Sequence, residues 1–185
     1  NGRYVAFESR ASNLVKGDTN QALDIFVRDR LTKQTTRVSV DSNGIQSNTG
    51  AGSLAPSISA DGRYVTFSSY ATNFVIPPFE TTDERIYVHD RTTKKTTLVS
   101  ETADFVPSTI SGDGRYIAFY SASSTIVPGD TNNVGDIFVY DRQSKQTTRV
   151  SVSSSGQQGN SWSNDLSPPS LSADGRYVVF ESLAN

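Results

Sequence analysis

The sequence contains no cysteine, no methionine and a single histidine, His89. Without cysteine the chain has no disulfide, no thiolate nucleophile and no cysteine ligand for a metal, and cysteine usage does not indicate a cellular compartment. One histidine leaves little material for a serine–histidine–aspartate triad or a histidine-rich metal site. Because methionine is missing even at position 1, we expect the chain to be a processed or trimmed product or a piece of a longer protein.

The sequence also lacks a strong charge of either sign and any long apolar run. Lys and Arg number 17 and Asp and Glu number 19, so the net charge is −2. This near balance predicts no nucleic-acid partner and no attachment to a membrane surface through basic residues. No stretch approaches the roughly 20 apolar residues of a membrane-spanning helix. Zinc-ligand signatures, the nucleophile elbow of hydrolases and the phosphate-binding loop are absent as well.

What the sequence does contain is a seven-residue stretch that occurs four times, at residues 1–7, 61–67, 113–119 and 174–180. Each copy reads Asp-Gly-Arg-Tyr, with Asn in place of Asp in the first, followed by Val or Ile, a variable residue and Phe. Asp-Gly between apolar runs predicts a tight turn, because glycine readily adopts positive φ. A repeat of this kind decides the architecture, so each copy is interpreted as a turn followed by a strand.

The complete repeat predicts four short strands joined as a meander, at residues 57–59, 63–69, 85–89 and 95–100. The second and third strands are apolar on consecutive residues, which indicates burial on both faces. The fourth strand alternates, as in residues 36–40, and is therefore expected to be half-exposed. The first is small and rich in serine. This combination favours a propeller blade packed between neighbours, with its first strand at the axis, over a two-layer sandwich.

The unit Pro-Ser-Ile-Ser-Ala-Asp-Gly-Arg-Tyr-Val-Thr-Phe, continued by Ile-Tyr-Val-His-Asp-Arg, resembles the TolB-type or PD40 (WD40-like) β-propeller repeat. The resemblance covers essentially the whole chain. It implies an all-β fold of four-stranded antiparallel blades, usually six or more of them, in a bacterial envelope or secreted protein. It does not imply one activity, because propellers carry many functions on one scaffold.

The repeats are expected at about residues 1–55, 56–106, 107–168 and 169–185, the last one partial. They supply three, four, four and two strands, or about three blades plus part of a fourth, which is too few to close a ring. We therefore expect the remaining blades to come from the same longer chain, or else from another copy. The incomplete blades expose unpaired strand edges, and these predict that the isolated segment oligomerises or aggregates.

Long connections on one face of the ring are the expected place for function, because loops on a rigid scaffold concentrate binding residues. Two of these loops share a Gly-Asp-Thr-Asn stretch with oxygen-bearing side chains at spacings that could hold Ca²⁺. A structural turn, in which Asp and Asn bond their own backbone, is the favoured alternative, and the loop at 76–85 lacks the pattern. The candidate metal donors are Asp18, Asn20, Asp24, Asp130, Asn132 and Asp136.

A second pair of long loops is polar and rich in glycine. Their amide side chains, with one tryptophan nearby as a stacking surface, could bind a sugar, although a plain solvated loop is the favoured interpretation. The candidate ligand residues are Asn43, Gln46, Asn48, Gln157, Asn160 and Trp162.

The pair Asp-Arg recurs at the end of each third strand, at residues 29–30, 90–91 and 141–142. Repetition in every blade favours a turn-capping aspartate and a structural arginine over an ion pair at an active site. His89 occupies a position that holds arginine or tyrosine in the other repeats, and is therefore interpreted as a variable strand residue.

These observations predict a non-catalytic extracellular or envelope module that binds or scaffolds through its long-loop face, with a protein or carbohydrate ligand. The resemblance implies an extracellular, cell-surface or periplasmic location, and the abundance of Ser and Thr agrees with it. Two alternatives stay open: a propeller region of a secreted hydrolase or lyase that processes peptides or polysaccharides, and a structural subunit of a surface assembly. The first alternative includes glycoside cleavage by a pair of carboxylates, because the distance between two carboxylates cannot be read from a sequence. Whether the chain is an enzyme is undecided, with the non-catalytic interpretation preferred.

Overall fold

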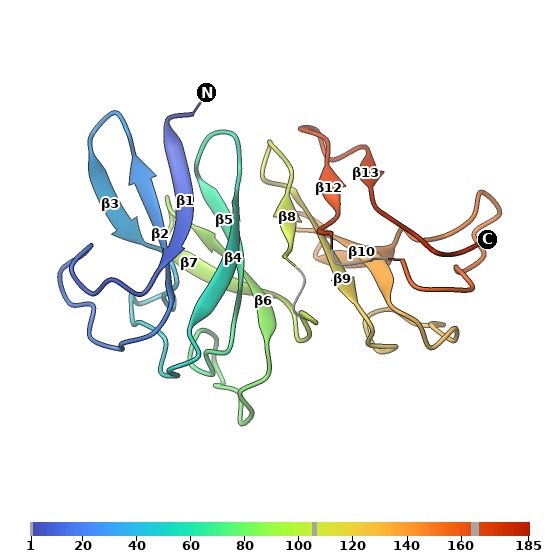
Figure 1. Ribbon diagram of the computed structural model, residues 1–185, viewed down its shortest axis with the longest axis horizontal. Coiled ribbons are helices and arrows are strands. Elements are labelled where there is room, and N and C mark those ends of the chain that lie inside the picture. Colours follow the sequence, from blue (N-terminus) through green and yellow to red (C-terminus); the bar gives the residue numbers. More distant parts are fainter. Residues whose placement is uncertain (1, 105–106, 164–166) are drawn as a thin grey trace.

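The computed structural model describes residues 2–104, 107–163 and 167–185, which form β-strands and connecting loops (Figure 1). Asn1, which opens the first repeat, and Val106, which ends the second, lie outside the described residues. The described part of the chain holds no helix that could cross a membrane. The chain folds into four antiparallel sheets, in agreement with the predicted propeller blades.

The sheets contain three, four, four and two strands, each strand beside the next one in the chain. The first blade comprises β1 (Tyr4–Ser9), β2 (Asp24–Asp29) and β3 (Gln34–Arg37). The second comprises β4 (Ser53–Ile58), β5 (Tyr64–Ser69), β6 (Arg85–Asp90) and β7 (Lys95–Ser100). The third comprises β8 (Thr109–Ile110), β9 (Tyr116–Ser121), β10 (Asp136–Asp141) and β11 (Gln146–Arg149). The fourth comprises β12 (Ser170–Leu171) and β13 (Val178–Val179).

The first strands of successive blades adjoin one another, as the prediction of an inner position requires. The Ser57 hydroxyl of β4 accepts the Ile110 amide of β8 at 3.2 Å. Thr109 of β8 donates its hydroxyl to the Pro169 carbonyl, just before β12, at 2.8 Å. Small hydroxyl side chains thus allow the inner strands to approach closely and satisfy their polar groups there.

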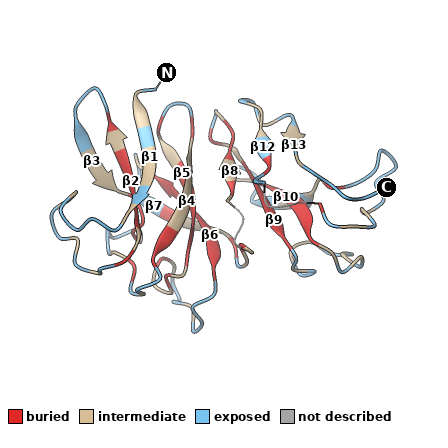
Figure 2. Cartoon of the chain, in the orientation of Figure 1, coloured by how far each residue is buried: buried red, intermediate tan, exposed pale blue. Residues whose placement is uncertain are grey.

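The apolar cores lie between the blades (Figure 2). The first cluster joins β2 residues Ile25 and Val27 to Phe67 and Tyr87 of the second blade. A second cluster joins β6 to the third blade in the same way. The third is smaller, because only Tyr120 and Ile137 are buried in it. Each blade is therefore stabilised by its neighbours, since one sheet alone cannot cover its own faces.

Burial of the second and third strands follows their continuous apolar pattern, except in the second strands of the first and fourth blades, where Val5 and Val179 are exposed. Val65 in β5 and Ile117 in β9 are fully buried, whereas the equivalent Val5 in β1 is 44% exposed. The side chain of Val65 packs against the preceding blade, and no described residue covers Val5 in that way. Exposure here reflects position in the array rather than the local sequence.

Two strand boundaries differ from the predictions. The inner strand of the second blade begins at Ser53, so the predicted repeat boundary after Ala55 falls inside β4. The register of β4 shifts between Leu54 and Ser57. Because such a bulge breaks the period of two, the sequence of this strand does not show the alternation of apolar and polar residues by which a strand is predicted. The outer strand of the first blade ends at Arg37, and Val40 keeps only an isolated bridge to Gln46.

Candidate functional site

The Gly-Asp-Thr-Asn loop of the first blade places its acids around an arginine. Nη1 of Arg37 lies 3.0 Å from Oδ1 of Asp18 and 3.2 Å from Oδ2 of Asp24. The Ser39 hydroxyl donates to the other Asp24 oxygen at 2.5 Å. The Asn20 side chain instead accepts a backbone amide two residues further on. A guanidinium therefore occupies the position between the two carboxylates.

The third blade repeats this arrangement. Nη1 of Arg149 lies 3.0 Å from Oδ1 of Asp130 and 2.9 Å from Oδ2 of Asp136. Ser151 donates to Asp136 at 2.6 Å, and the Asn132 amide donates to the same carboxylate at 3.1 Å. Asp136 is fully buried, and burying a carboxylate is unfavourable unless it is paired and hydrogen-bonded in this way.

In the second blade, the aspartate and the arginine of this ion pair are both replaced. Arg85 stands where the other two blades have a buried aspartate, at the start of the third strand. Leu98 stands where they have the paired arginine, at the same register position. A blade without the acid thus also lacks the arginine, as a structural ion pair requires.

Calcium binding at the six predicted donors stays a prediction. The structure brings each aspartate pair together, but around a guanidinium that a calcium ion would have to displace. Among the described residues, no group of three or more His, Cys, Asp or Glu side chains is placed to hold a metal ion. The signal that points to the arginine was in the sequence, in the shared stretch Thr-Thr-Arg-Val-Ser-Val of residues 35–40 and 147–152.

The predicted ligand amides of the first blade are engaged in bonds between loops. Gln46 donates to the Thr19 hydroxyl at 2.7 Å and accepts the Thr19 amide at 3.3 Å. Asn48 donates to the Thr72 hydroxyl at 2.8 Å and accepts the Thr72 amide at 3.1 Å. Since Thr72 belongs to the second blade, Asn48 braces one blade against the next.

The equivalent loop of the third blade uses its amides in the same way. Asn160 donates to Asn185 at 2.7 Å and accepts its backbone amide at 3.1 Å. Gln158, rather than the predicted Gln157, accepts the amides of Thr131 and Asn132 at 3.2 and 3.1 Å. Aligning the two loops residue by residue would have identified Gln158 as the counterpart of Gln46.

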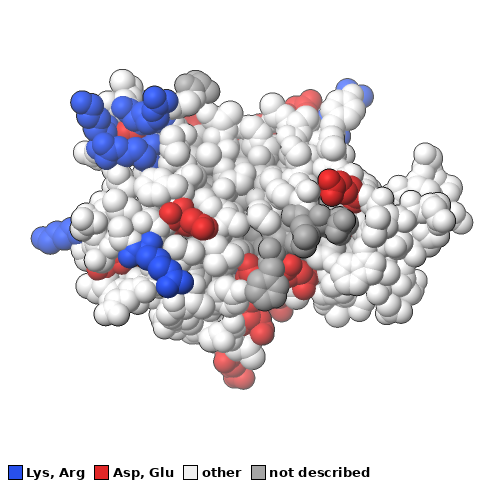
Figure 3. Space-filling view, in the orientation of Figure 1, with Lys and Arg blue, Asp and Glu red and all other residues white. Residues whose placement is uncertain are grey.

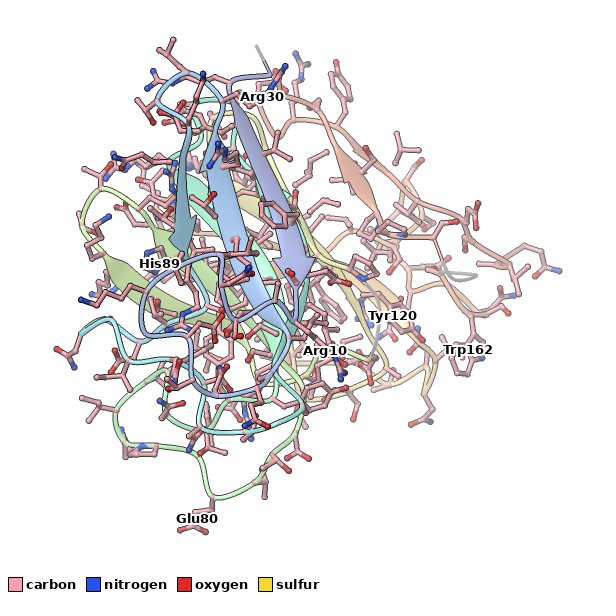
Figure 4. The ribbon with its side chains drawn as sticks, turned by 60° about the vertical axis from the view of Figure 1, so that its left-hand side comes forward. Arg10, Arg30, Glu80, His89, Tyr120 and Trp162 are labelled. Atoms are coloured by element: carbon pink, nitrogen blue, oxygen red, sulfur yellow. The ribbon has the colours of Figure 1, made fainter. Side chains whose placement is uncertain are left out.

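The three remaining candidates lie at the surface. Asn43 donates to Asp41 within its own turn at 3.3 Å. Gln157 is exposed, and Trp162 is 51% exposed and projects from the end of the molecule far from His89 (Figure 4). The two sets of predicted ligand residues belong to different blades and do not form one site.

A groove of about 500 Å³ between the first and second blades is the best candidate for a binding site. Four cationic side chains line it, Lys16 from the β1–β2 loop, Arg37 from β3, and Arg91 and Lys94 from the β6–β7 turn. Asn43 adds an amide, and no carboxylate of the described residues contributes to the lining. Neither Lys16 nor Lys94 forms an ion pair within the part of the chain that the structure describes.

The corresponding spaces at the other interfaces have different chemistry. The one between the second and third blades, of about 650 Å³, contains Asp83 and Glu101 beside Arg85. The one at the fourth blade, of about 450 Å³, is lined by uncharged side chains, Gln157 and Asn160 among them. The cationic lining is thus a property of one interface and is not repeated with the fold.

His89 contacts the groove from its buried side. Its side chain is 3% exposed, and Nδ1 lies 2.9 Å from the Thr96 hydroxyl. Burial lowers the pKa of His89 to about 4, and the nearby Lys94 acts in the same direction. The imidazole is therefore neutral at physiological pH. Sequence reasoning missed this groove because its lining comes from separate segments, and nothing local marks Lys16 or Lys94.

Comparison with known proteins confirms the fold. No protein-family model matches the sequence, and no curated protein matches it. Among solved structures, TolB from Acinetobacter baumannii matches with a TM-score of 0.56 and 19% identity, over 96% of this chain and 34% of that chain. The tricorn protease matches with a TM-score of 0.55 and 17% identity, over 98% of this chain and 14% of that chain. A structure described as oligogalacturonate lyase in complex with manganese matches with a TM-score of 0.51 and 14% identity, over 96% of this chain and 41% of that chain.

The likeness is one of fold, and the chain spans only part of each of these proteins, 34% of TolB and 14% of the tricorn protease. A propeller of the TolB type is thereby shown. Structures of this fold include a protease and a lyase as well as TolB, so the architecture by itself assigns no activity.

Proposed function

We propose that this TolB-type propeller segment is a non-catalytic binding module that holds an acidic ligand in the groove between its first two blades. The observation that carries the proposal is the lining of this groove by Lys16, Arg91 and Lys94 without a carboxylate. Its volume of about 500 Å³ lies within the range of small-ligand sites, roughly 300–1,000 Å³. Unpaired cations on low-dielectric walls raise the local concentration of anions.

The ligand class that fits best is a short acidic oligosaccharide. Ser42, Asn43 and Thr35 offer hydroxyl and amide groups beside the cations, which suits the alternating hydroxyl and carboxylate groups of a uronate chain. The lyase among the structural neighbours is named for oligogalacturonate, a sugar chain of this type. An acidic peptide is the second ligand that the charge would admit.

A binding role is preferred over catalysis because of the state of the histidine. His89 is buried, bonded to Thr96 and neutral, so it is poorly placed to exchange protons with a ligand in the groove. The enzymatic alternative places chemistry in another domain of a longer protein, and the sequence of its full reading frame would test it. An envelope or extracellular location is part of the proposal and can be tested by fractionating cells that express the natural protein.

Calorimetric titration with a galacturonate tetramer, and with a neutral galactose tetramer as the reference, tests the ligand class. We expect the uronate alone to bind, with an affinity that falls as salt is added. Lys94→Glu should weaken binding by roughly 3–10-fold or more, because it puts a like charge beside the ligand. The matched control is Lys145→Glu, the same turn position in the third blade with the same positive φ, outside the groove. Equal binding of the two tetramers would overturn the proposal, as would an equal effect of the two substitutions.

A further inference from the structure

The hydrogen bonds around His89 determine which nitrogen of its ring carries the proton. The Thr96 hydroxyl donates its one hydrogen to the Val40 carbonyl at 2.5 Å, because a carbonyl oxygen can only accept. The same hydroxyl lies 2.9 Å from Nδ1 of His89 and therefore accepts a hydrogen bond there. Nδ1 is thus the protonated nitrogen of the neutral imidazole, and Nε2 keeps its lone pair.

Nε2 is the atom of this side chain that has no partner in the part of the chain that the structure describes. It is not among the polar atoms that are shut off from solvent without a hydrogen bond. His89 is almost completely buried, and the side on which it meets solvent lines the groove between the first two blades. Figure 4 places His89 beside the first-blade strand β3, which lines the same groove. The lone pair of Nε2 is therefore presented to the groove.

An imidazole at this position is particular to the second blade. Arg28 in the first blade and Tyr140 in the third occupy the same register position, each opposite a threonine of the outer strand. The Arg28 guanidinium even donates to its threonine, Thr35, at 3.0 Å. The blade thus accepts unrelated side chains here, so the fold does not explain why the second blade has a histidine.

The surroundings of Nε2 restrict what it can bind. Lys16, Arg91 and Lys94 line the groove and would repel a metal cation. Figure 3 shows further Lys and Arg side chains gathered over the turn that joins β2 to β3. An ionised carboxylate only accepts hydrogen bonds, so it has no hydrogen to offer the lone pair, whereas a hydroxyl group has one. Burial, followed by the charge of Lys94, lowers the pKa of His89 to about 4, which keeps the lone pair free at neutral pH.

We propose that Nε2 of His89 accepts a hydrogen bond from a hydroxyl group of the ligand whose carboxylates are bound by Lys16 and Lys94. This inference rests on the proposed function and narrows its ligand to an acid that carries hydroxyl groups beside its carboxylates. A uronate chain has both groups, and the carboxylate side chains of an acidic peptide do not. His89 is then a specificity-determining residue, because a ligand without the hydroxyl leaves a buried acceptor unpaired.

Nitrogen-15 NMR tests the proposal directly, since His89 is the only histidine of the chain. At neutral pH, we expect the free protein to show a protonated Nδ1 and an unprotonated Nε2. Adding the galacturonate tetramer should move the Nε2 signal towards that of a hydrogen-bonded nitrogen and leave the Nδ1 signal in place. A protonated Nε2 in the free protein overturns the proposal, and so does an Nε2 signal that stays fixed while calorimetry shows that the tetramer binds.

Two substitutions separate the acceptor from the packing of the ring. His89→Asn keeps an amide N–H near the position of Nδ1 but has no atom at the position of Nε2, whereas His89→Gln can place an amide oxygen there. His89→Asn should weaken binding of the galacturonate tetramer by roughly 3–10-fold, the net value of one neutral hydrogen bond, and His89→Gln should restore most of the affinity. Thermal melting establishes that both variants are folded. An equal loss in the two variants overturns the acceptor role.

A glutamate tetramer, which has carboxylates and no hydroxyl group, is the matched ligand. Its binding should be the same for the wild type and His89→Asn, and a loss as large as that of the uronate overturns the inference. Uronate binding that Lys94→Glu weakens and His89→Asn does not would overturn this inference and leave the proposed function standing. A wild type that does not bind the galacturonate tetramer at all would overturn both.

Discussion

At the residue scale, the buried aspartates of the first and third blades depend on one arginine each. Asp24 and Asp136 are fully buried, and each receives a guanidinium and a serine hydroxyl. Taking such a charge out of water is unfavourable unless it is paired and hydrogen-bonded. The second blade replaces both partners, with Arg85 and Leu98, which indicates that the pair stabilises the structure as a unit.

Arg149→Leu should lower the free energy of unfolding by about 3–5 kcal/mol, because Asp136 would be left buried without its cation. Chemical denaturation measures this change. The double variant Asp136→Asn, Arg149→Leu should recover part of the loss, and a double-mutant cycle gives the coupling between the two residues. A single-variant loss below about 1 kcal/mol would show that the pair behaves like an exposed one.

Calcium and the ion pair predict opposite results in a titration. We expect millimolar calcium to produce no heat above dilution with the wild type, because Arg37 and Arg149 already occupy the space between the carboxylates. Asp130→Ala is the control for any heat that does appear. Heat that is lost in Asp130→Ala would instead support the calcium site predicted at Asp130, Asn132 and Asp136.

His89 should make the protein less stable as the pH falls from about 6.5 to 4. Burial lowers its pKa from 6.5 to about 4 in the folded protein, so below pH 6.5 the unfolded chain takes up a proton that the folded one does not. The loss reaches about 3 kcal/mol near pH 4, and stability does not depend on this group above about pH 7. Denaturation at a series of pH values measures it.

His89→Gln should remove this dependence between pH 6.5 and 4. The aspartates Asp29, Asp90 and Asp141 titrate in another window. Hydrogen bonds from Arg3 and Arg115 hold the pKa of Asp29 and Asp141 below the usual 3.8. Burial opposes the shift at Asp90, where Arg63 and backbone amides prevail. Their contribution is lost only below pH 3.8, so a slope that persists above that value in His89→Gln would contradict the assignment.

At the element scale, the turn before each second strand determines how blades meet. In the second blade, the Ser59 amide donates to the Tyr64 carbonyl and the Tyr64 amide donates to the Ser59 hydroxyl, each at 2.9 Å. Asp61 accepts the Arg63 amide at 2.9 Å. Gly62 adopts a φ of 75°. The sequence predicted this turn because its signal is local, and the same holds for the apolar second and third strands. The contact of this glycine with a tyrosine of the preceding blade was not predictable, because it joins residues about one repeat apart.

Substitutions at two turn glycines can distinguish the cost of backbone strain from the cost of a steric clash. Gly114 and Gly129 have φ of 74° and 77°, but only Gly114 has a ring against it. Alanine at Gly129 should cost about 1–2 kcal/mol from the positive φ alone. Gly114→Ala should cost a further 1–3 kcal/mol, because the Tyr64 ring must move. Thermal denaturation of the two variants compares them, and equal losses would show that the ring shifts without penalty.

At the scale of the whole molecule, the chain is a linear array in which each core joins two neighbouring blades. The repeats predicted that array, since every blade carries the same local signals. They did not predict the cationic groove, whose chemistry depends on Lys16 and Lys94, which lie in different blades. The bulge in β4 was also not predictable from the sequence, because it interrupts the regular pattern by which a strand is recognised.

The array should open from its fourth blade. The cluster that holds this blade buries only Tyr120 and Ile137, with Val178 and Phe180 packed on it in part, whereas the other two clusters each bury eight residues. Because stability in a linear array is close to a sum of neighbour contacts, amide protection should be greatest in β5, β6, β9 and β10 and least in β12 and β13. Hydrogen exchange followed by mass spectrometry measures this gradient. The experiment belongs at low protein concentration, because pairing of exposed strand edges between copies would protect β13. At that concentration, protection in β13 equal to that in β9 would show that the fourth blade is held as firmly as the others and that the burial of its core does not set its stability.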